Sequence, residues 1–194
     1  MKKLFIVFVL ISYLGRSQNV QSSNTYIQTC YHSQNCFSLN SSSFIFYDPE
    51  NHELMITVDF SKFKVGVDTL DAWLDDLDDT KLIFRGILNT NDLLELTHHN
   101  SNVTLVNGMI NFNGVSHPHS IELTLFEISK EGMLYKNNQQ DYYDRINANL
   151  QLGFYPKEFN VHKKAHQLRK KITIAIYKGH INMFKPEMEH WIKN

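Results

Sequence analysis

The feature that most constrains the fold is a period-two alternation of apolar residues, which recurs in short runs along the chain. In one run Leu54, Ile56, Val58 and Phe60 occupy every second position. This period places alternate side chains on one face of a β-strand, so that one face is buried. The pattern predicts further strands within residues 43–47, 81–88, 109–112, 120–125, 145–152 and 172–176.

Turn-forming residues separate these runs and indicate hairpins. Pro49 lies in a turn between the first two runs, and Asn113-Gly114 opens a turn that we expect to extend to Pro118. There is no regular alternation of strands with helices, so we predict an all-β, antiparallel fold with one or two short helices. Such a sheet hides its edges by closing into a barrel or by doubling into a sandwich, and periodicity alone does not distinguish the two.

A short helix is predicted between the early strands. Leu70, Trp73, Leu74 and Leu77 share one face of a helix over residues 69–77, and acidic residues occupy the other face. Helix capping and the helix dipole account for those acidic residues without a calcium ion. We expect Trp73 and Leu74 to cover one end of the sheet, and residues 162–169 to form a helical turn.

The N-terminus has the pattern of a secretory signal peptide. Lys2 and Lys3 precede an apolar run that ends before Gly15, which is too short for a spanning helix. We therefore expect residues 1–18 to be removed, and a periplasmic or secreted protein that does not span the membrane. No cysteine lies at the cleavage junction, so no lipid anchor is expected there.

The two cysteines, Cys30 and Cys36, both lie in the segment of residues 19–42. In an oxidising compartment they are expected to form a disulfide that closes a small loop outside the alternating strands. Their separation does not match the Cys-x-x-Cys of a redox site, so a redox or metal pair is the weaker interpretation.

Charge and motifs exclude several other functions. The formal net charge is −1 and the basic residues near position 170 lack interleaved aromatic residues, so no nucleic-acid partner is expected. Among the ten histidines, the pairs His117/His119, His98/His99 and His162/His166 invite a zinc hypothesis, but none belongs to a known ligand pattern, and no metal is predicted. No catalytic motif and no cofactor-binding loop is present, so we predict no catalytic residue, no cofactor and no enzyme activity.

Three stretches carry a resemblance to a known family: Lys81 to Gly86, Asn107 to Leu125, and Asn149 to Phe159 followed by Ile172 to Ile176. In their order and in the Gly114-Val115 hairpin they resemble the YceI-like family of periplasmic proteins. The resemblance implies an antiparallel lipocalin-like β-barrel, here over residues 43–184 with a tail at 185–194. It also implies a polyisoprenoid or another long-chain apolar ligand, such as a fatty-acyl lipid, enclosed in that barrel.

The predicted ligand cavity is lined by the large apolar residues of the inferred inner face. These are Phe44, Phe46, Ile56, Val58, Phe60, Trp73, Phe84, Ile110, Phe112, Leu123 and Leu150. A barrel filled by its own side chains predicts the same alternation. An envelope stress or interaction protein with a filled core, and a barrel enzyme of unknown chemistry, are therefore the alternative functions. The oligomeric state is unknown from the sequence.

Overall fold

A computed structural model of the chain describes residues 20–31, 35–64, 71–72, 74, 77–89, 91–92, 101–127, 146–161 and 171–183. Its eight strands form a closed antiparallel barrel in which each strand pairs with the next along the chain. The strands are β1 (Ser23–Tyr31), β2 (Asn35–Asp48), β3 (Glu53–Asp59), β4 (Lys81–Ile87), β5 (Ser101–Phe112), β6 (Val115–Glu127), β7 (Ile146–Phe154) and β8 (Ile172–Met183). The predicted all-β fold is confirmed.

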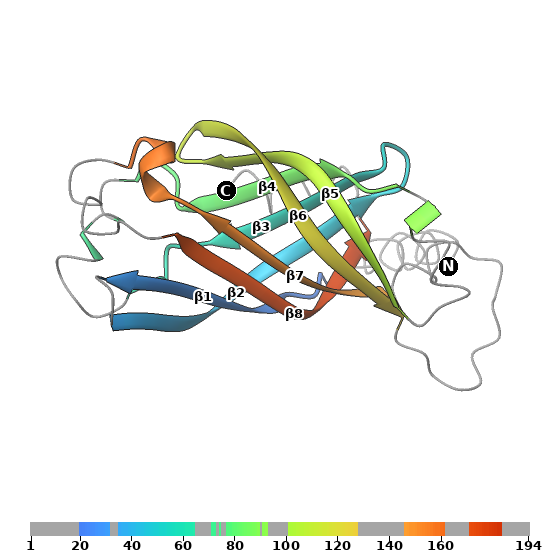
Figure 1. Ribbon diagram of the computed structural model, residues 1–194, viewed down its shortest axis with the longest axis horizontal. Helices are drawn as coiled ribbons and strands as arrows, with labels where there is room; N and C mark the ends of the chain where they lie inside the picture. Colours follow the sequence, from blue (N-terminus) through green and yellow to red (C-terminus); the bar gives the residue numbers. More distant parts are fainter. Residues whose placement is uncertain are drawn as a thin grey trace, which may run out of the picture.

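The barrel closes between its first and last strands. β1 pairs antiparallel with β8, with Ile27 opposite Ile174, and β8 then continues past the start of β1 to pair in parallel with β2. A short 3-10 helix, η3 (Pro156–Phe159), follows β7 and lies at the left end of the barrel in Figure 1. The turn between β2 and β3 lies at the opposite end (Figure 1).

The two predicted hairpin turns are present. Asn113 and Gly114 join β5 to β6 with φ angles of 50° and 73°, as a two-residue turn of this handedness requires. The turn is shorter than predicted, because Ser116 to Pro118 already belong to β6. In the turn after β2, the Asp48 carboxylate accepts a hydrogen bond from the Glu50 backbone nitrogen at 2.9 Å.

The core lies inside the barrel. Alternate residues of the strands meet there in one cluster of buried apolar side chains. Among the described residues that are buried, none carries a charged side chain. Burial of apolar area is the main force that holds such a fold together.

The prediction that residues 19–42 lie outside the strands is wrong. Ser23–Tyr31 forms β1, and the first part of β2 starts at Asn35. Thr25 and Thr29 are buried on the same face of β1 as Ile27. Because hydroxyl side chains replace apolar ones at alternate positions, this strand lacks an apolar period. Cys36 is disulfide-bonded and lies opposite Cys30 in the β1–β2 register, within the barrel wall.

Only part of the predicted helix at 69–77 lies among the described residues. Leu74 is buried in the core, and Leu77 packs against it. The backbone nitrogen of Asp78 donates to Asn113 Oδ1 at 3.0 Å, so this segment lies beside the β5–β6 turn. Trp73, residues 1–18, the helical turn at 162–169 and the tail at 185–194 lie outside the described residues. No helix in the described part of the chain is long and apolar enough to cross a membrane.

Candidate ligand-binding site

The lumen of the barrel is the site that the sequence predicts, and most of the predicted lining residues meet there. They are buried in the single inner cluster: Ile56, Val58, Phe60, Phe84, Ile110, Phe112, Leu123 and Leu150. The strand registers explain this arrangement, because Ile56 lies opposite Phe84 and Phe84 lies opposite Ile110. Residues far apart in sequence therefore form one apolar wall along β3 to β7.

Phe44 and Phe46 are not part of that wall, and their prediction as lining residues is wrong. They belong to a separate cluster with Met55, which packs against Val20 and Ile83 on the outer face. Their rings stack with centroids 6.1 Å apart. The residues of β2 that do face inward are their neighbours Ile45 and Tyr47. Trp73, the remaining predicted lining residue, lies outside the described residues.

One end of the lumen is closed by aromatic rings, and we call it the aromatic end: Phe60, Phe63, Phe112, Phe154 and Phe159. Phe112 contacts Phe60 and Phe154 with ring centroids 5.4 Å away in each case. Phe154 meets Phe159 of η3 edge to face at 5.5 Å. Such tilted and edge-on arrangements are the favourable geometry for aromatic pairs. The rings form a compact plug.

Two hydrogen bonds attach η3 over the aromatic end. His117 Nε2 donates to the backbone oxygen of Glu158 at 2.7 Å, because a carbonyl can only accept. Asn113 Nδ2 donates to the backbone oxygen of Phe159 at 3.3 Å. The His117 ring also packs against Phe159, with centroids 5.0 Å apart. These contacts hold the plug in place.

The opposite end is lined by aliphatic side chains, and we call it the aliphatic end: Leu54, Leu88, Val106, Leu125 and Ile146. Gly86 lies in the wall between Phe84 and Leu88. A Cβ atom at Gly86 would lie 2.9 Å from Phe84 Cζ and 2.8 Å from Val106 Cγ1. The ring of Phe84 therefore occupies the space that the missing side chain leaves.

The described lumen is tightly packed in this conformation. Ile56, Val58 and Phe84 have no exposed surface at all. A side chain beside a void large enough for water would retain some accessible area, so no such void touches these three. A ligand can enter this part of the lumen only if inner side chains move.

Hydroxyl groups interrupt the apolar wall near β1. Thr25, Thr29 and Ser43 are buried. The hydroxyl oxygens of Thr25 and Ser43 are 2.6 Å apart and form a hydrogen bond. The Thr29 hydroxyl has no hydrogen-bond partner, which is unusual for a buried polar group.

The structure also shows how two of the candidate metal ligands are placed. His117 and His119 both lie on β6 and are partly exposed, and in the β5–β6 register they lie opposite Ile110 and Gly108, on the face of β6 that carries Ile121 further along. The Nε2 atom of His117 is engaged with Glu158, as described above. Among the described residues no group of three or more possible ligands could hold a metal ion. His98, His99, His162 and His166 lie outside those residues.

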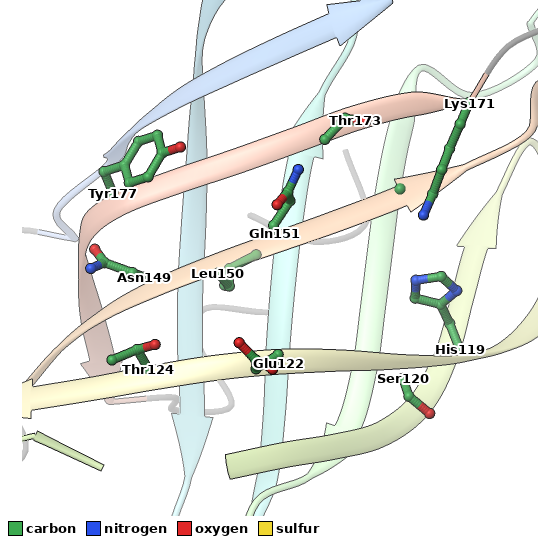
Figure 2. A pocket seen from close by; sticks show the side chains of 11 residues that line it. His119, Ser120, Glu122, Thr124, Asn149, Leu150, Gln151, Lys171, Thr173 and Tyr177 are labelled. Atoms are coloured by element: carbon green, nitrogen blue, oxygen red, sulfur yellow. The ribbon is translucent and has the colours of Figure 1, made fainter. Parts of the chain in front are cut away.

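A second concave site, which the sequence did not predict, lies on the outer face of β6, β7 and β8 (Figure 2). We call it the outer groove; its volume is about 570 Å³. It is lined by His119, Ser120, Glu122, Thr124, Asn149, Leu150, Gln151, Gly153, Lys171, Thr173 and Tyr177. Most of these side chains are polar, in contrast to the lumen.

His119 lies at one end of the outer groove. Its partial burial lowers the pKa of the imidazole below the ordinary value of 6.5. The positive charge of Lys171 lowers that pKa further, while the carboxylate of Glu158 opposes the shift. His119 is therefore held in its neutral form over a wider pH range than a free histidine.

The fold is similar to that of a domain of known structure. A polyisoprenoid-binding domain from Saccharophagus degradans, implicated in plant cell wall breakdown, superposes with a TM-score of 0.53 and 11% identity over 79% of this chain and 90% of that chain. BcnA of Burkholderia cenocepacia covers 79% of this chain and 93% of its own, with 12% identity and a TM-score of 0.43. Neither family models nor curated proteins match the sequence. At this identity the first likeness shows the fold, and it confirms the predicted lipocalin-like barrel.

Proposed function

We propose that the chain is an exported member of the YceI-like family that encloses a long apolar chain, a polyisoprenoid or a fatty-acyl lipid, in its barrel. The observation that carries this proposal is the largely apolar inner wall of a closed barrel, without a buried charge among the described residues. An eight-stranded barrel is just wide enough either to be filled by its own side chains or to hold one small ligand. The proposed role is binding, and no catalytic group is assigned.

The fold likeness supports the ligand class. The similar domain from Saccharophagus degradans is described as polyisoprenoid-binding, and it shares the barrel over 79% of this chain. Each buried methylene contributes about 0.8 kcal/mol, so one five-carbon isoprene unit contributes roughly 3–4 kcal/mol before ordering costs. A few units are therefore sufficient for stable binding.

The ligand enters from the aliphatic end, because the aromatic end is plugged by Phe112, Phe154 and Phe159. The first movement is a rotation of the Phe84 ring away from Gly86, which has no side chain of its own to fill the space that the ring leaves. Aliphatic side chains such as Leu54 and Leu125 then change rotamer around the ligand chain. Apolar contacts of this kind select for length and shape more than for single methylene groups.

Export is part of the proposal, and the signal-peptide pattern of residues 1–18 supports it. The mature protein is then periplasmic or secreted, where Cys36 can be oxidised. Intact-mass analysis of the exported protein tests this part. A mass that still includes residues 1–18 contradicts it.

The deciding experiment is mass spectrometry of organic molecules extracted from the purified mature protein, followed by titration with a fluorescent prenyl or fatty-acyl probe. Leu123→Trp fills the inner wall and should abolish probe binding, since Leu123 is fully buried in the lumen. Its matched control is Leu105→Trp, because Leu105 is 63% exposed on the outside and should leave binding unchanged. Absence of any lipid and of any saturable probe binding by the wild type refutes the proposal.

A second function is favoured by one observation. The inner side chains Ile56, Val58 and Phe84 have no exposed surface, as in a permanently filled barrel. A barrel of that kind would act through its outer surface as an interaction protein. In that case Leu123→Trp only lowers the free energy of unfolding, because overpacking a filled core costs about 1–3 kcal/mol, and wild-type protein takes up no probe.

A further inference from the structure

We infer that the outer groove of β6, β7 and β8 is a carbohydrate-binding site that takes a short oligosaccharide carrying a carboxylate at one end. This site is distinct from the lumen, since lining side chains such as Glu122, Gln151 and Thr173 lie on the opposite face of the strands from the core, while Leu150 borders both. Its volume of about 570 Å³ falls within the range of roughly 300–1,000 Å³ that is usual for small-molecule sites.

The floor of the groove is made of short or polar residues that leave room above the sheet. Gln151 lies opposite Glu122 in the β6–β7 register, and Asn149 lies opposite Thr124. Gly153 lies opposite Thr173 of β8. Amide, carboxylate and hydroxyl groups thus alternate across the strands, and together they offer both donors and acceptors. Neighbouring hydroxyls of a sugar ring need such a mixture.

A β-bulge shapes one end of the groove. Between Ala148 and Leu150 the register with β8 shifts, so that Tyr177 and Lys178 both face Asn149. Lys178 has a φ of 51°, which is uncommon for a residue other than glycine. Asn149 Oδ1 accepts a hydrogen bond from the Lys178 backbone nitrogen at 2.7 Å and stabilises this conformation. Bulges that redirect a side chain are frequent next to functional sites.

Tyr177 lies beside this bulge, on the same outer face of β8 as Thr173. It is 57% exposed and lies at the end of the groove opposite Lys171 (Figure 2). Tyr26 supports it from β1, with ring centroids 5.8 Å apart. The C–H face of a pyranose is apolar while its edges carry hydroxyls. An exposed tyrosine ring can therefore stack on the C–H face while the neighbouring polar groups hydrogen-bond to the hydroxyls.

Lys171 forms the other end. Its side chain lies across Gly153, and its Nζ is 3.0 Å from the point where a Cβ atom on Gly153 would be. The absence of a side chain at Gly153 therefore allows the ammonium group to reach over β7 towards His119 (Figure 2). Lys171 forms no ion pair with another of the described residues. Its ammonium is available for a ligand carboxylate.

The charge pattern selects one class of ligand. Lys171 attracts a carboxylate at one end, while Glu122 in the middle accepts hydrogen bonds from hydroxyls and repels a second anionic group. A polyanion or a nucleic acid is disfavoured for the same reason. A ligand with a neutral sugar unit over Tyr177 and an acidic sugar unit near Lys171 fits this charge pattern.

The test uses two disaccharides that differ in one group, cellobiuronic acid and cellobiose, titrated into the mature protein and followed by NMR chemical-shift changes. We expect the acid to bind more tightly, with the largest shifts at residues of β6, β7 and β8. Lys171→Met should weaken only the acid, by about two- to fivefold, as is usual for an exposed ion pair. Tyr177→Ala should weaken both disaccharides by about two- to tenfold.

Matched controls lie outside the groove. Lys62→Met removes another exposed lysine, and Tyr155→Ala removes another exposed tyrosine, so neither should change either affinity. Absence of saturable binding for both disaccharides overturns the inference. Equal affinities of the wild type for the two also overturn it, as does binding that Lys171→Met and Tyr177→Ala leave unchanged. These outcomes are independent of lipid uptake by the lumen.

Discussion

The hydroxyl groups of Thr25 and Ser43 lie 2.6 Å apart and hydrogen-bond to each other across the β1–β2 pair, inside the barrel. Thr25→Val should lower the free energy of unfolding by about 1–3 kcal/mol, because it leaves the Ser43 hydroxyl buried without a partner. The double variant Thr25→Val/Ser43→Ala should cost no more than the single one. Urea denaturation of both variants measures this coupling. Additive losses would show that the pair is not coupled.

Thr29→Val provides the opposite case. The Thr29 hydroxyl is buried and has no partner, so its removal relieves an unmet desolvation cost and sacrifices no hydrogen bond. We expect a free energy of unfolding equal to or above that of the wild type, although the residue lies on the same strand face as Thr25. A loss as large as that of Thr25→Val would mean that the Thr29 hydroxyl does have a partner in solution.

Acidification should reveal the contribution of His119. The folded state holds its pKa below 6.5, so the unfolded chain binds this proton more readily. The associated stability is present above pH 6.5, declines as the pH falls through that value, and is lost below the lowered folded pKa. His119→Gln should make the dependence of unfolding free energy on pH shallower in that window.

A complementary NMR titration checks the cause of this shift. Lys171→Met removes a charge that lowers the pKa of His119, so that pKa should rise towards the ordinary value. Lys62→Met should leave it where it is. An unchanged His119 pKa in Lys171→Met would rule out the lysine as a cause.

Phe84 and Phe46 should differ in their effect on ligand uptake. Phe84→Leu and Phe46→Leu each replace a fully buried ring, and each is expected to lower the free energy of unfolding by about 0.5–3 kcal/mol. Only Phe84→Leu opens space above Gly86 in the lumen, so it should speed the uptake of a fluorescent acyl probe. Stopped-flow fluorescence distinguishes the two variants. Equal uptake rates would argue against entry past Phe84.

Loss of the disulfide should weaken the barrel without abolishing it. Cys36→Ser removes a cross-link that closes a short loop, which the chain-entropy model values at about 2 kcal/mol. Because Cys36 lies opposite Cys30 between β1 and β2, the loss should appear as faster hydrogen exchange in β1. Uniformly faster exchange in all strands would instead indicate a global effect.

The strands from residue 43 onward could be predicted because their inner positions are apolar. Leu54, Ile56 and Val58 of β3 illustrate this, and all three are in the core. β1 was missed because Thr25 and Thr29 occupy inner positions that are apolar in the other strands. A hydroxyl can be buried when it is hydrogen-bonded, and local sequence does not reveal that partner.

The face of β2 was predicted wrongly for a different reason. Phe44, Ile45, Phe46 and Tyr47 are all apolar or aromatic, so the alternation does not indicate which pair faces inward. Phe44 and Phe46 were predicted to face the lumen, but Phe46 is buried on the outer face against Met55. Burial on both faces of a strand removes the polar residues that would mark its outer side.

The outer groove could not be predicted, because it depends on register. Glu122, Gln151 and Thr173 come from three separate strands, and only pairing brings them onto one surface. The bulge beside Tyr177 also depends on pairing with Asn149. Gly153 is the single local signal, since a glycine inside a strand often marks a place where another group approaches closely.

The pairing of β8 with two different strands has a mechanical consequence. β8 holds β1 at Thr25–Gln28 and then holds β2 at Ile45–Tyr47. If a pulling force peels β1 from the wall, the contact between β8 and β2 still keeps the remaining seven strands joined at one end. We expect extension in an optical trap to show an intermediate that lacks only β1, and a single rupture of the whole barrel would contradict this order of events.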